Sequence, residues 1–385
     1  MLLNRAKLLA SPAANTVFTT VLTRGPVVRP EIARLTGLSS AAVTKAVKPM
    51  IEAGYLEELT LGPRTAEGAG RPAHPLAVRA DREFFVGVKV TADELIGVVT
   101  DLRAQVVGAA HRIAVTDRSV EGVVRDIAAL VTELTPAHAE RTHHIGVSVS
   151  GDVDRPGGVV RYSPFLGWHD VPLAELVGSA TGLAVTVEND VKALTVAEQW
   201  FGEGVGADSF ALATVGVGIG CGLVVNGRLV AGGYGVAGEI GHIPVAAGDG
   251  PECHCGARGC VEAIASEAAI VSRARRAADD PGLDMAGAID RAHGGDAAVR
   301  AVFDEAGKAI GLGLAAVVNL VGPERVVVSG EGVAAYDLFE EQIRAAFTMQ
   351  AFGAAARCPL VVRPLPWEEW ARGAAAVSIQ SLFTA

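Results

Sequence analysis

The chain contains the run GEIGH at 238–242 and, a short distance further on, CHCGARGCVE at 253–262. Within these runs, four side chains offer nitrogen or sulfur donors: His242, Cys253, Cys255 and Cys260. Zn²⁺ prefers such donors, and a closed set of four protein ligands is typical of a structural rather than a catalytic zinc site. Buried structural cysteines are the alternative, but the surrounding glycines and polar residues would make a poor core. We therefore predict a structural Zn²⁺, with His254 outside its ligand set.

Strand-like patterns lie on both sides of these runs. Apolar alternation predicts strands at 85–90, 94–100 and 105–111, then a helix over 120–134 and a strand at 145–149. A second series of the same kind begins near Phe210. Two α/β lobes that each open with a β-meander form a fold class in which ligands bind between the lobes.

Charge separates the beginning of the chain from the rest. The first eighty residues carry ten Lys/Arg and five Asp/Glu, whereas the remaining residues carry 23 and 38. A basic head on an acidic body suggests that only the head meets a polyanion. Cys221 and Cys358 stand alone, unlike a disulfide framework. No stretch resembles a secretory signal or a membrane span, so we expect a cytoplasmic protein.

The basic head has the pattern of a helix-turn-helix. Helical spacing predicts a helix over 13–22, a second from Pro30 that closes at Gly37, and a third after Leu38-Ser39-Ser40. Two helices separated by a short glycine-containing turn match the motif whose second helix enters the major groove. Because Pro49 removes a backbone donor from the third helix, we expect a bend near Lys48.

A wing is predicted after these helices. Segments 55–60 and 75–78 have the composition of strands, and a Gly/Pro/Arg-rich segment joins them. Within that segment, Arg71 is an extended arginine suited to a minor groove. The predicted DNA contacts are Ser39, Ser40, Thr44, Lys45, Lys48 and Arg71. A three-helix interaction module that does not touch DNA is the alternative interpretation.

Together with the cysteine runs, five further segments make the chain resemble the ROK family of repressors, open reading frames and kinases. They are GVSVSG at 146–151, SPFLGW at 163–168, END at 188–190, GVGIG at 216–220 and SGEG at 329–332. The resemblance implies an actin-like ATPase fold, sugar-kinase-like and ribonuclease-H-like, with a hexose in the cleft. It implies that the sugar is held by Asn189, Asp190, Glu239, His242 and Glu262. Asp190 matches the catalytic base of the family's kinases.

The sugar ligands are chemically suitable, because sugar hydroxyls both donate and accept hydrogen bonds and so match carboxylates and amides. The usual Asn before Leu-Gly-Trp is Phe165 here, which leaves the choice of sugar open. The predicted α/β chain has three parts: a winged helix-turn-helix at 1–80, a first lobe at 84–190 completed by a helix at 371–385, and a second lobe with the zinc site at 191–370.

Three nucleotide contacts of the family's kinases are altered. Lys89 replaces the Asp of the first-lobe Asp-x-Gly-Gly-Thr turn, Val217 replaces a Thr, and Glu331 stands where glycine is usual. Phosphoryl transfer depends on positioning and on neutralising phosphate charge, so these changes argue against a kinase. We expect a sugar-responsive repressor of carbohydrate-metabolism genes. An active sugar kinase with an accessory DNA-binding head is the alternative.

Lys89 is expected to form an ion pair with Asp190, because a buried carboxylate without metal or nucleotide would otherwise lack a positive neighbour. The alternative is a Lys89 that points to solvent at the strand end. The expected partners are operator DNA and a monosaccharide or sugar-phosphate effector. A homodimer or homotetramer would allow two heads to bind a two-part operator.

Overall fold

The computed structural model describes residues 11–60, 74–246, 248 and 250–383. The chain divides into two compact units. The first comprises Met1–Gly206 with Trp370–Ala385, and the second comprises Ala207–Glu369. The C-terminal helix therefore belongs to the first unit, although the whole second unit separates it from the other elements in sequence.

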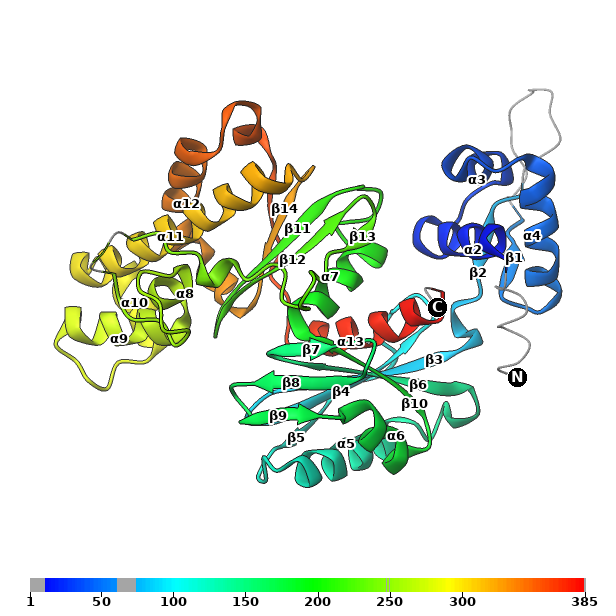
Figure 1. Cartoon of the computed structure of the whole chain (residues 1–385), viewed down its shortest axis with the longest axis horizontal. Coiled ribbons are helices and arrows are strands. Elements are labelled where there is room, and N and C mark those ends of the chain that lie inside the picture. The colour runs from blue at the N-terminus through cyan, green and yellow to red at the C-terminus, as the bar shows by residue number, and fades with distance from the viewer. Residues whose placement is uncertain (1–10, 61–73, 247, 249, 384–385) are drawn as a thin grey trace. The chain divides into compact units, whose positions relative to one another are not determined.

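The first unit begins with helices and a two-stranded antiparallel sheet, coloured blue in Figure 1. These elements are α2 (Pro12–Arg24), α3 (Arg29–Thr36), α4 (Ser40–Glu52), β1 (Leu56–Glu58) and β2 (Leu76–Val78). The hydroxyl of Ser39 accepts a hydrogen bond from Ala42 N and caps α4. Gly37, at φ 69°, ends α3 in the left-handed conformation that few other residues adopt. The helices and strands occur where the sequence predicts them, and α4 continues through Pro49.

A five-stranded sheet in the order β10-β6-β3-β4-β5 forms the body of the first unit. Its strands are β3 (Phe84–Val90), β4 (Glu94–Asp101), β5 (His111–Ala114), β6 (Thr142–Val149) and β10 (Ala184–Asn189). β6 runs parallel to β3 and β10 runs parallel to β6, whereas β4 runs antiparallel to β3 and β5 runs antiparallel to β4. A smaller antiparallel sheet contains β7 (Asp152–Asp154), β8 (Val159–Ser163) and β9 (Trp168–Val171).

Helices cover both faces of this sheet (Figure 1). On one face lie α5 (Val120–Leu134) and α6 (Leu173–Thr181), and on the other lies α13 (Glu368–Ser381). A methyl group at Gly87 would stand 2.0 Å from Ala371 O, and one at Gly146 would stand 1.8 Å from Ala374 O. Glycine at these two strand positions therefore lets α13 lie directly on the sheet. The remaining helix, α7 (Asp190–Phe201), follows β10 without a loop.

One predicted strand is wrong. The sequence predicts a strand at 105–111, but β5 starts only at His111. A carboxylate oxygen of Asp101 accepts hydrogen bonds from Arg103 N and Gln105 N, and Ala104 adopts φ 53°. Side-chain capping of this kind stabilises a turn, and it competes with strand pairing where apolar alternation would otherwise favour a strand.

The second unit repeats the arrangement with the sheet β13-β12-β11-β14-β15. Its strands are β11 (Phe210–Val215), β12 (Ile219–Val225), β13 (Arg228–Leu229), β14 (Val326–Ser329) and β15 (Leu360–Val362). Its helices are α8 (Val261–Ala265), α9 (Glu267–Ala278), α10 (Met285–His293), α11 (Ala297–Val321) and α12 (Tyr336–Gln350). Short 3₁₀ helices occur at Ala80–Arg82, Ala139–Arg141, Ile240–His242, Glu331–Ala335 and Gly353–Arg357.

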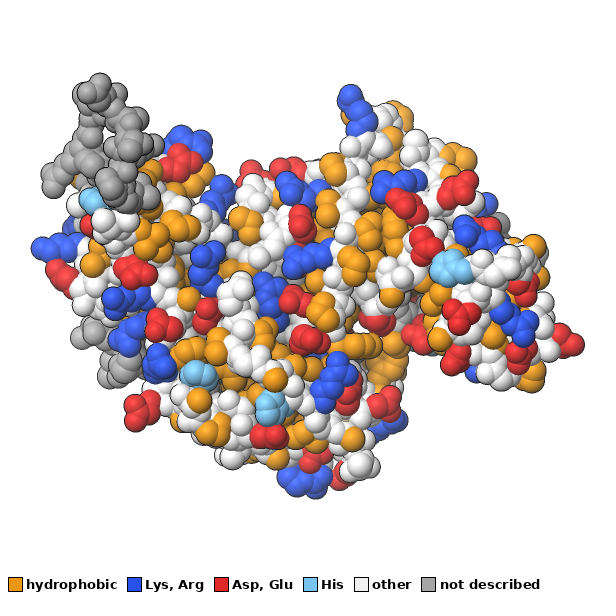
Figure 2. Space-filling model, turned by 180° about the vertical axis from the view of Figure 1, so that it is seen from behind, with side chains coloured by type: hydrophobic (Ala, Val, Ile, Leu, Met, Phe, Trp, Pro, Cys, Tyr) orange, Lys and Arg blue, Asp and Glu red, His pale blue; other side chains and the backbone are white. Residues whose placement is uncertain are grey.

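Acidic and basic side chains are interspersed on the face shown in Figure 2, so the acidic excess of the chain is spread rather than gathered there. Among the described residues, no helix is both long enough and apolar enough to cross a membrane.

Candidate ligand, metal and DNA sites

The end of β3 holds a buried ion pair. The Lys89 ammonium donates to Asp190 Oδ2, and the two side chains are 5% and 11% exposed. Ser150 also donates to Asp190 Oδ2, at 2.5 Å, and Val191 N donates to Oδ1 at 2.9 Å. The ammonium lies 5.4 Å from the centre of the Trp370 ring, a cation–π arrangement. The ion pair predicted from the sequence is therefore confirmed, and Lys89 does not point to solvent.

The charge of Lys89 governs the ionisation of Asp190. Burial by itself raises the pKa of Asp190, but the Lys89 charge and the hydrogen bonds from Lys89, Ser150 and Val191 together lower it below its usual value. At the neighbouring Glu188 the balance is opposite, since burial raises its pKa although Arg155 lies 3.5 Å away. Asp190 is thus held as a carboxylate that already has a permanent counter-charge.

The predicted sugar ligands belong to both units. Asn189 and Asp190 lie in the first unit, at the start of α7. Asn189 caps this helix by accepting a bond from Lys192 N at 3.1 Å, and its amide donates to Gly151 O at 3.0 Å. Glu239, His242 and Glu262 lie in the second unit. The convergence of all five on one sugar stays a prediction.

Phe165, which replaces the usual polar residue of the family, is 48% exposed. Its ring is therefore accessible to a ligand or to solvent, and the structure gives it no role in the core.

The four residues predicted as metal ligands come together. His242, Cys253, Cys255 and Cys260 each offer one ligand atom, and these atoms all lie within 4.8 Å of one another. Cys253 Sγ is 3.5 Å from His242 Nδ1, and Cys255 Sγ is 3.9 Å from Cys260 Sγ. Three thiols and one imidazole are a soft donor set, so this cluster could hold a metal ion.

Glu262 joins the cysteine cluster to the glycine-rich turn after β11. One oxygen of Glu262 lies 3.1 Å from His254 Nδ1, and the other accepts a hydrogen bond from Ile219 N at 3.0 Å. His242, His254 and Glu262 also form a second group that could hold a metal ion. His242 is common to both groups, and the three thiols favour the first. His254 thus pairs with a carboxylate and stays outside the four-ligand set.

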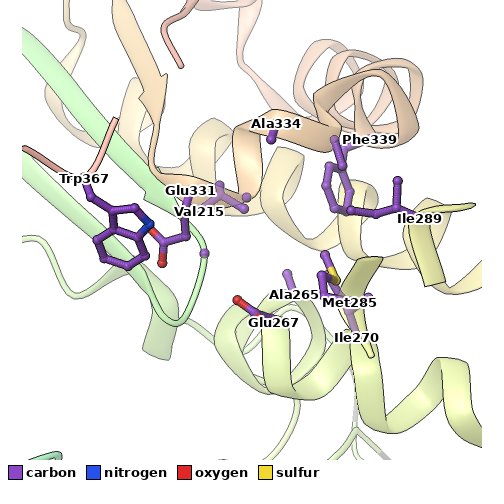
Figure 3. Close-up of a pocket in the computed structure, with 13 residues that line it drawn as sticks. Val215, Ala265, Glu267, Ile270, Met285, Ile289, Glu331, Ala334, Phe339 and Trp367 are labelled. Atoms are coloured by element: carbon purple, nitrogen blue, oxygen red, sulfur yellow. The ribbon is translucent and has the colours of Figure 1, made fainter. Parts of the chain in front are cut away.

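Val217 and Glu331, two of the residues from which the sequence predicts a lost nucleotide site, contact each other. Glu331 Oε1 accepts a hydrogen bond from Val217 N at 2.7 Å, although the two residues are far apart in sequence. Figure 3 shows Glu331 beside Val215, the last residue of β11. The Glu331 carboxylate is therefore held by the backbone of the turn itself.

The exposed side of α4 carries the described residues that were predicted to contact DNA. Ser39, Ser40, Thr44, Lys45 and Lys48 are all exposed, whereas Val43, Val47 and Met50 are buried in the head. Two of the hydroxyls also bond locally: Ser39 caps α4, and Thr44 donates to Ser40 O at 2.9 Å. Lys48 lies 3.9 Å from Glu52. Arg71 lies outside the described residues.

The sequence did not predict an aromatic contact between the head and Phe383, which follows α13. Phe18 of α2 stacks on Phe383 with ring centres 5.2 Å apart, and Trp200 of α7 lies 6.0 Å from the same ring. Asn15 donates a hydrogen bond to Phe383 O. Helix α7 therefore begins at Asp190, and near its other end Trp200 lies against Phe383. Phe383 in turn stacks on Phe18 of the head. The only sequence signal was an aromatic residue near the C-terminus.

Comparisons with known proteins agree with these features. The ROK family matches residues 85–381. The Mlc DNA-binding transcriptional repressor of Escherichia coli is 28% identical over 356 residues, covering 89% of this chain and 86% of the repressor. A glucokinase of Thermotoga maritima is 34% identical over 233 residues, 57% of this chain and 73% of the kinase. The crystal structure of a ROK family transcriptional regulator, described as a homologue of Mlc, matches with TM-score 0.81 at 26% identity, covering 98% of this chain and 97% of the regulator.

Proposed function

Because the chain belongs to the ROK family, we propose that it is a sugar-responsive, DNA-binding transcriptional regulator that represses carbohydrate-metabolism genes. The observation that carries this proposal is the likeness to a ROK regulator over 98% of the chain, which includes the basic head that precedes the family match at residue 85. The glucokinase likeness covers 57% of the chain.

The head supplies the DNA contacts of this proposal. Lys45 and Lys48 on the exposed side of α4 would meet phosphates, and Ser40 and Thr44 would lie toward base edges. Arg71 would enter the minor groove beside the wing. A homodimer or homotetramer would present two heads to a two-part operator.

A monosaccharide or sugar phosphate would be the effector, held by Asn189, Asp190, Glu239, His242 and Glu262. The buried Lys89–Asp190 pair supports binding without phosphorylation. A general base must accept a proton, and a carboxylate with a lowered pKa and a permanent ammonium partner is a poor acceptor. Val217 and Glu331 remove two further contacts that phosphoryl transfer needs.

Zinc is the metal that the four-residue cluster would hold. With Zn–S bonds of about 2.3 Å, sulfur atoms of a tetrahedral site stand about 3.8 Å apart. The separation of 3.9 Å between Cys255 Sγ and Cys260 Sγ fits this geometry. Since Glu262 bonds both to the cluster region and to the turn at Ile219, the metal would have a structural role beside the sugar ligands.

Helix α7 offers a physical route between effector and DNA. A sugar bound at Asp190 would act on the first turn of a 12-residue helix whose far end carries Trp200. From Trp200 the contact continues to Phe383 and then to Phe18 of the head. A rigid helix between two sites is a suitable element for coupling their affinities.

The test is a gel-shift titration of promoter DNA with the full chain, repeated with a panel of monosaccharides and sugar phosphates. A salt-dependent shift that one sugar changes by about tenfold is expected, within the usual range of coupling. DNA binding that no sugar alters would contradict the proposal.

The alternative, an active sugar kinase with a DNA-binding head, draws on the 34% identity to a glucokinase. An ADP-release assay with the same sugars distinguishes the two proposals. Turnover that rises with sugar concentration would favour the kinase, and the regulator proposal expects none.

A further inference from the structure

Residues on both sides of the short strand β7 contact the end of β10. Before β7, Gly151 O accepts a hydrogen bond from the Asn189 side-chain amide at 3.0 Å. After β7, Arg155 Nη1 lies 3.5 Å from Glu188 Oε2. One strand of three residues therefore holds two consecutive residues of β10, and the second of them is the proposed sugar ligand Asn189.

Glu188 is a buried carboxylate that bonds to the backbone of Asn189. Its side chain is 5% exposed, and its Oε1 accepts a hydrogen bond from Asn189 N at 2.8 Å. Its other oxygen faces the Arg155 guanidinium. A buried charge is costly unless an opposite charge compensates for the loss of water. The backbone of Asn189 is therefore held by a carboxylate that itself needs Arg155.

Arg155 is anchored in turn by the last turns of α13. Its Nη1 donates to Gln380 Oε1 at 3.0 Å, and its Nη2 donates to Val377 O at 3.5 Å. The Arg155 side chain is 23% exposed, so protein covers most of it. A guanidinium presents several donors in a fixed planar arrangement, and it can contact a carboxylate and two groups of a helix at the same time. Arg155 thus joins the turn after β7, the end of β10 and α13.

Two cations act on the Glu188 carboxylate: Arg155 and, on α7, Lys192. Ser148, opposite Glu188 on β6, and Gln380, which bonds to Arg155, carry no charge. Burial raises the pKa of Glu188, and the two positive charges lower it again without cancelling the effect of burial. Loss of Arg155 should therefore raise this pKa further.

We propose that Arg155 is a positioning residue for the sugar effector, which holds the Glu188 carboxylate in place and, through it, the backbone of Asn189. The sugar then meets an Asn189 that is already ordered, so binding does not have to pay the entropy of ordering it. Arg155 acts from behind this segment and does not itself touch the sugar. The inference rests on the proposed binding of a sugar by Asn189 and adds a residue to that site.

The first test is hydrogen exchange of the full chain without a ligand. Arg155→Met should speed exchange at Asn189 N about tenfold, which corresponds to the loss of one hydrogen bond to a charged group. Exchange at Val191 N, which donates to Asp190 Oδ1, should not change.

Arg112→Met is the matched control for Arg155→Met. Arg112 also pairs with a glutamate, since its Nη1 lies 3.1 Å from Glu94 Oε1, but the pair is on β4 and β5 at the other edge of the sheet. It should leave exchange at Asn189 N unchanged. Unchanged exchange at Asn189 N in Arg155→Met as well would overturn the proposal.

Stability as a function of pH separates a charge effect from a packing effect. The folded-state pKa of Glu188 lies above the unfolded value of about 4.3, so its contribution to stability is lost as pH rises through the folded pKa. Arg155→Met raises that pKa further, and its stability deficit in urea unfolding should shrink as pH falls from about 8 to about 5. Adding Glu188→Gln should recover part of the deficit at the higher pH. A deficit that neither pH nor Glu188→Gln changes would overturn the proposal.

Isothermal titration with D-glucose, D-xylose and N-acetyl-D-glucosamine connects Arg155 to the effector. A sugar that binds the natural chain should bind Arg155→Met about tenfold more weakly. Arg155→Lys, which keeps the positive charge, should recover part of the affinity, and Arg112→Met should bind like the natural chain. Equal sugar affinity in the natural chain and Arg155→Met would overturn the proposal.

The two proposals fail in different ways. Absence of binding by all three sugars to the natural chain would contradict the sugar site on which both rest. The exchange measurement needs no ligand, and it would still decide whether Arg155 holds Asn189. Sugar binding by the natural chain that Arg155→Met leaves intact would contradict the role of Arg155 alone.

Discussion

The end of β3 and the glycine turn after β11 each meet a charged side chain: Lys89 lies on β3 itself, and Glu331, from the segment after β14, bonds to the turn. At the end of β3 the added charge is positive, and the carboxylate of Asp190 meets it in a buried place. At the turn the added charge is negative, and a backbone N–H of Val217 meets it. An ion pair neutralises both partners, whereas an amide offers only a partial charge. The first place therefore holds a neutral pair of opposite charges, and at the second the Glu331 carboxylate is held by a backbone N–H.

This comparison predicts that the two places respond to different perturbations. The turn is tied to the cysteine cluster through Glu262, whose carboxylate accepts from Ile219 N, and the ion pair lies in the other unit. Loss of a metal from the cysteine cluster should weaken the contact between Glu262 and Ile219 N. It should leave the ion pair between Lys89 and Asp190 unchanged.

The largest effect is expected from Cys260→Ala. Because a structural zinc contributes its binding free energy to folding, this variant should lose bound metal and loosen the segment that carries Glu262. Metal analysis measures the loss, and hydrogen exchange should show faster exchange at Ile219 N with unchanged exchange at Val191 N. Cys358→Ala, which removes a thiol outside the cluster, is the matched control. Equally faster hydrogen exchange at Ile219 N and Val191 N would show that loss of the metal affects the glycine turn and the ion pair alike.

Lys89→Met should have the next largest effect. It leaves Asp190 buried without its counter-charge, and breaking a buried pair in this way costs about 3–5 kcal/mol of stability. Urea unfolding at neutral pH measures the loss. Adding Asp190→Asn to Lys89→Met should recover part of it, because no buried charge is then left alone. If the double variant is as unstable as Lys89→Met alone, the loss of stability comes from packing and not from the unpaired charge of Asp190.

The same pair predicts a pH dependence. The folded-state pKa of Asp190 lies below its usual value, so the stabilisation is fully present above the unfolded pKa of about 3.9 and is lost as pH falls through the folded pKa. The stability difference between the natural chain and Lys89→Met should therefore narrow below about pH 4. A difference that stays constant from pH 7 to acid would exclude a charge effect.

A smaller effect is expected from Phe383→Leu, which removes the ring between Trp200 and Phe18. Coupling between two sites is typically about 1–3 kcal/mol, and this variant should lose part of it. Gel shifts with and without the effector should show a reduced sugar response, with DNA affinity in the absence of sugar preserved. Phe352→Leu, at an exposed position in the second unit, should leave the response intact. An unchanged response in Phe383→Leu would exclude this contact as the route.

The smallest effect is expected from Lys45→Ala in the head. If Lys45 meets one phosphate, its removal should lower the slope of log affinity against log salt by about one. Fluorescence anisotropy at several salt concentrations measures the slope. Lys308→Ala, a charge removal in the second unit, should leave the slope unaltered. Equal slopes for Lys45→Ala and the natural chain would place the recognition surface elsewhere.

Much of this protein could be predicted from the sequence where the signal is local. The helix over 120–134 has the predicted bounds, since its apolar period and the Ser119 cap lie within one segment. The four candidate metal ligands come from a single stretch, and their donor chemistry is visible in the residue types. The strand at 105–111 was predicted wrongly because the Asp101 side chain stabilises a turn that apolar alternation does not reveal.

By itself, the sequence determined the order of the elements, the candidate metal cluster and the residue types at Lys89, Val217 and Glu331, because each depends on residue types and short spacings. Tertiary structure decided what those residues contact. Glu331 reaches Val217 only because β14 pairs with β11, and Phe383 reaches the head only because α13 packs over β3 and β6. Contacts between residues a hundred or more positions apart depend on how sheets and helices pack, and local patterns do not carry that information.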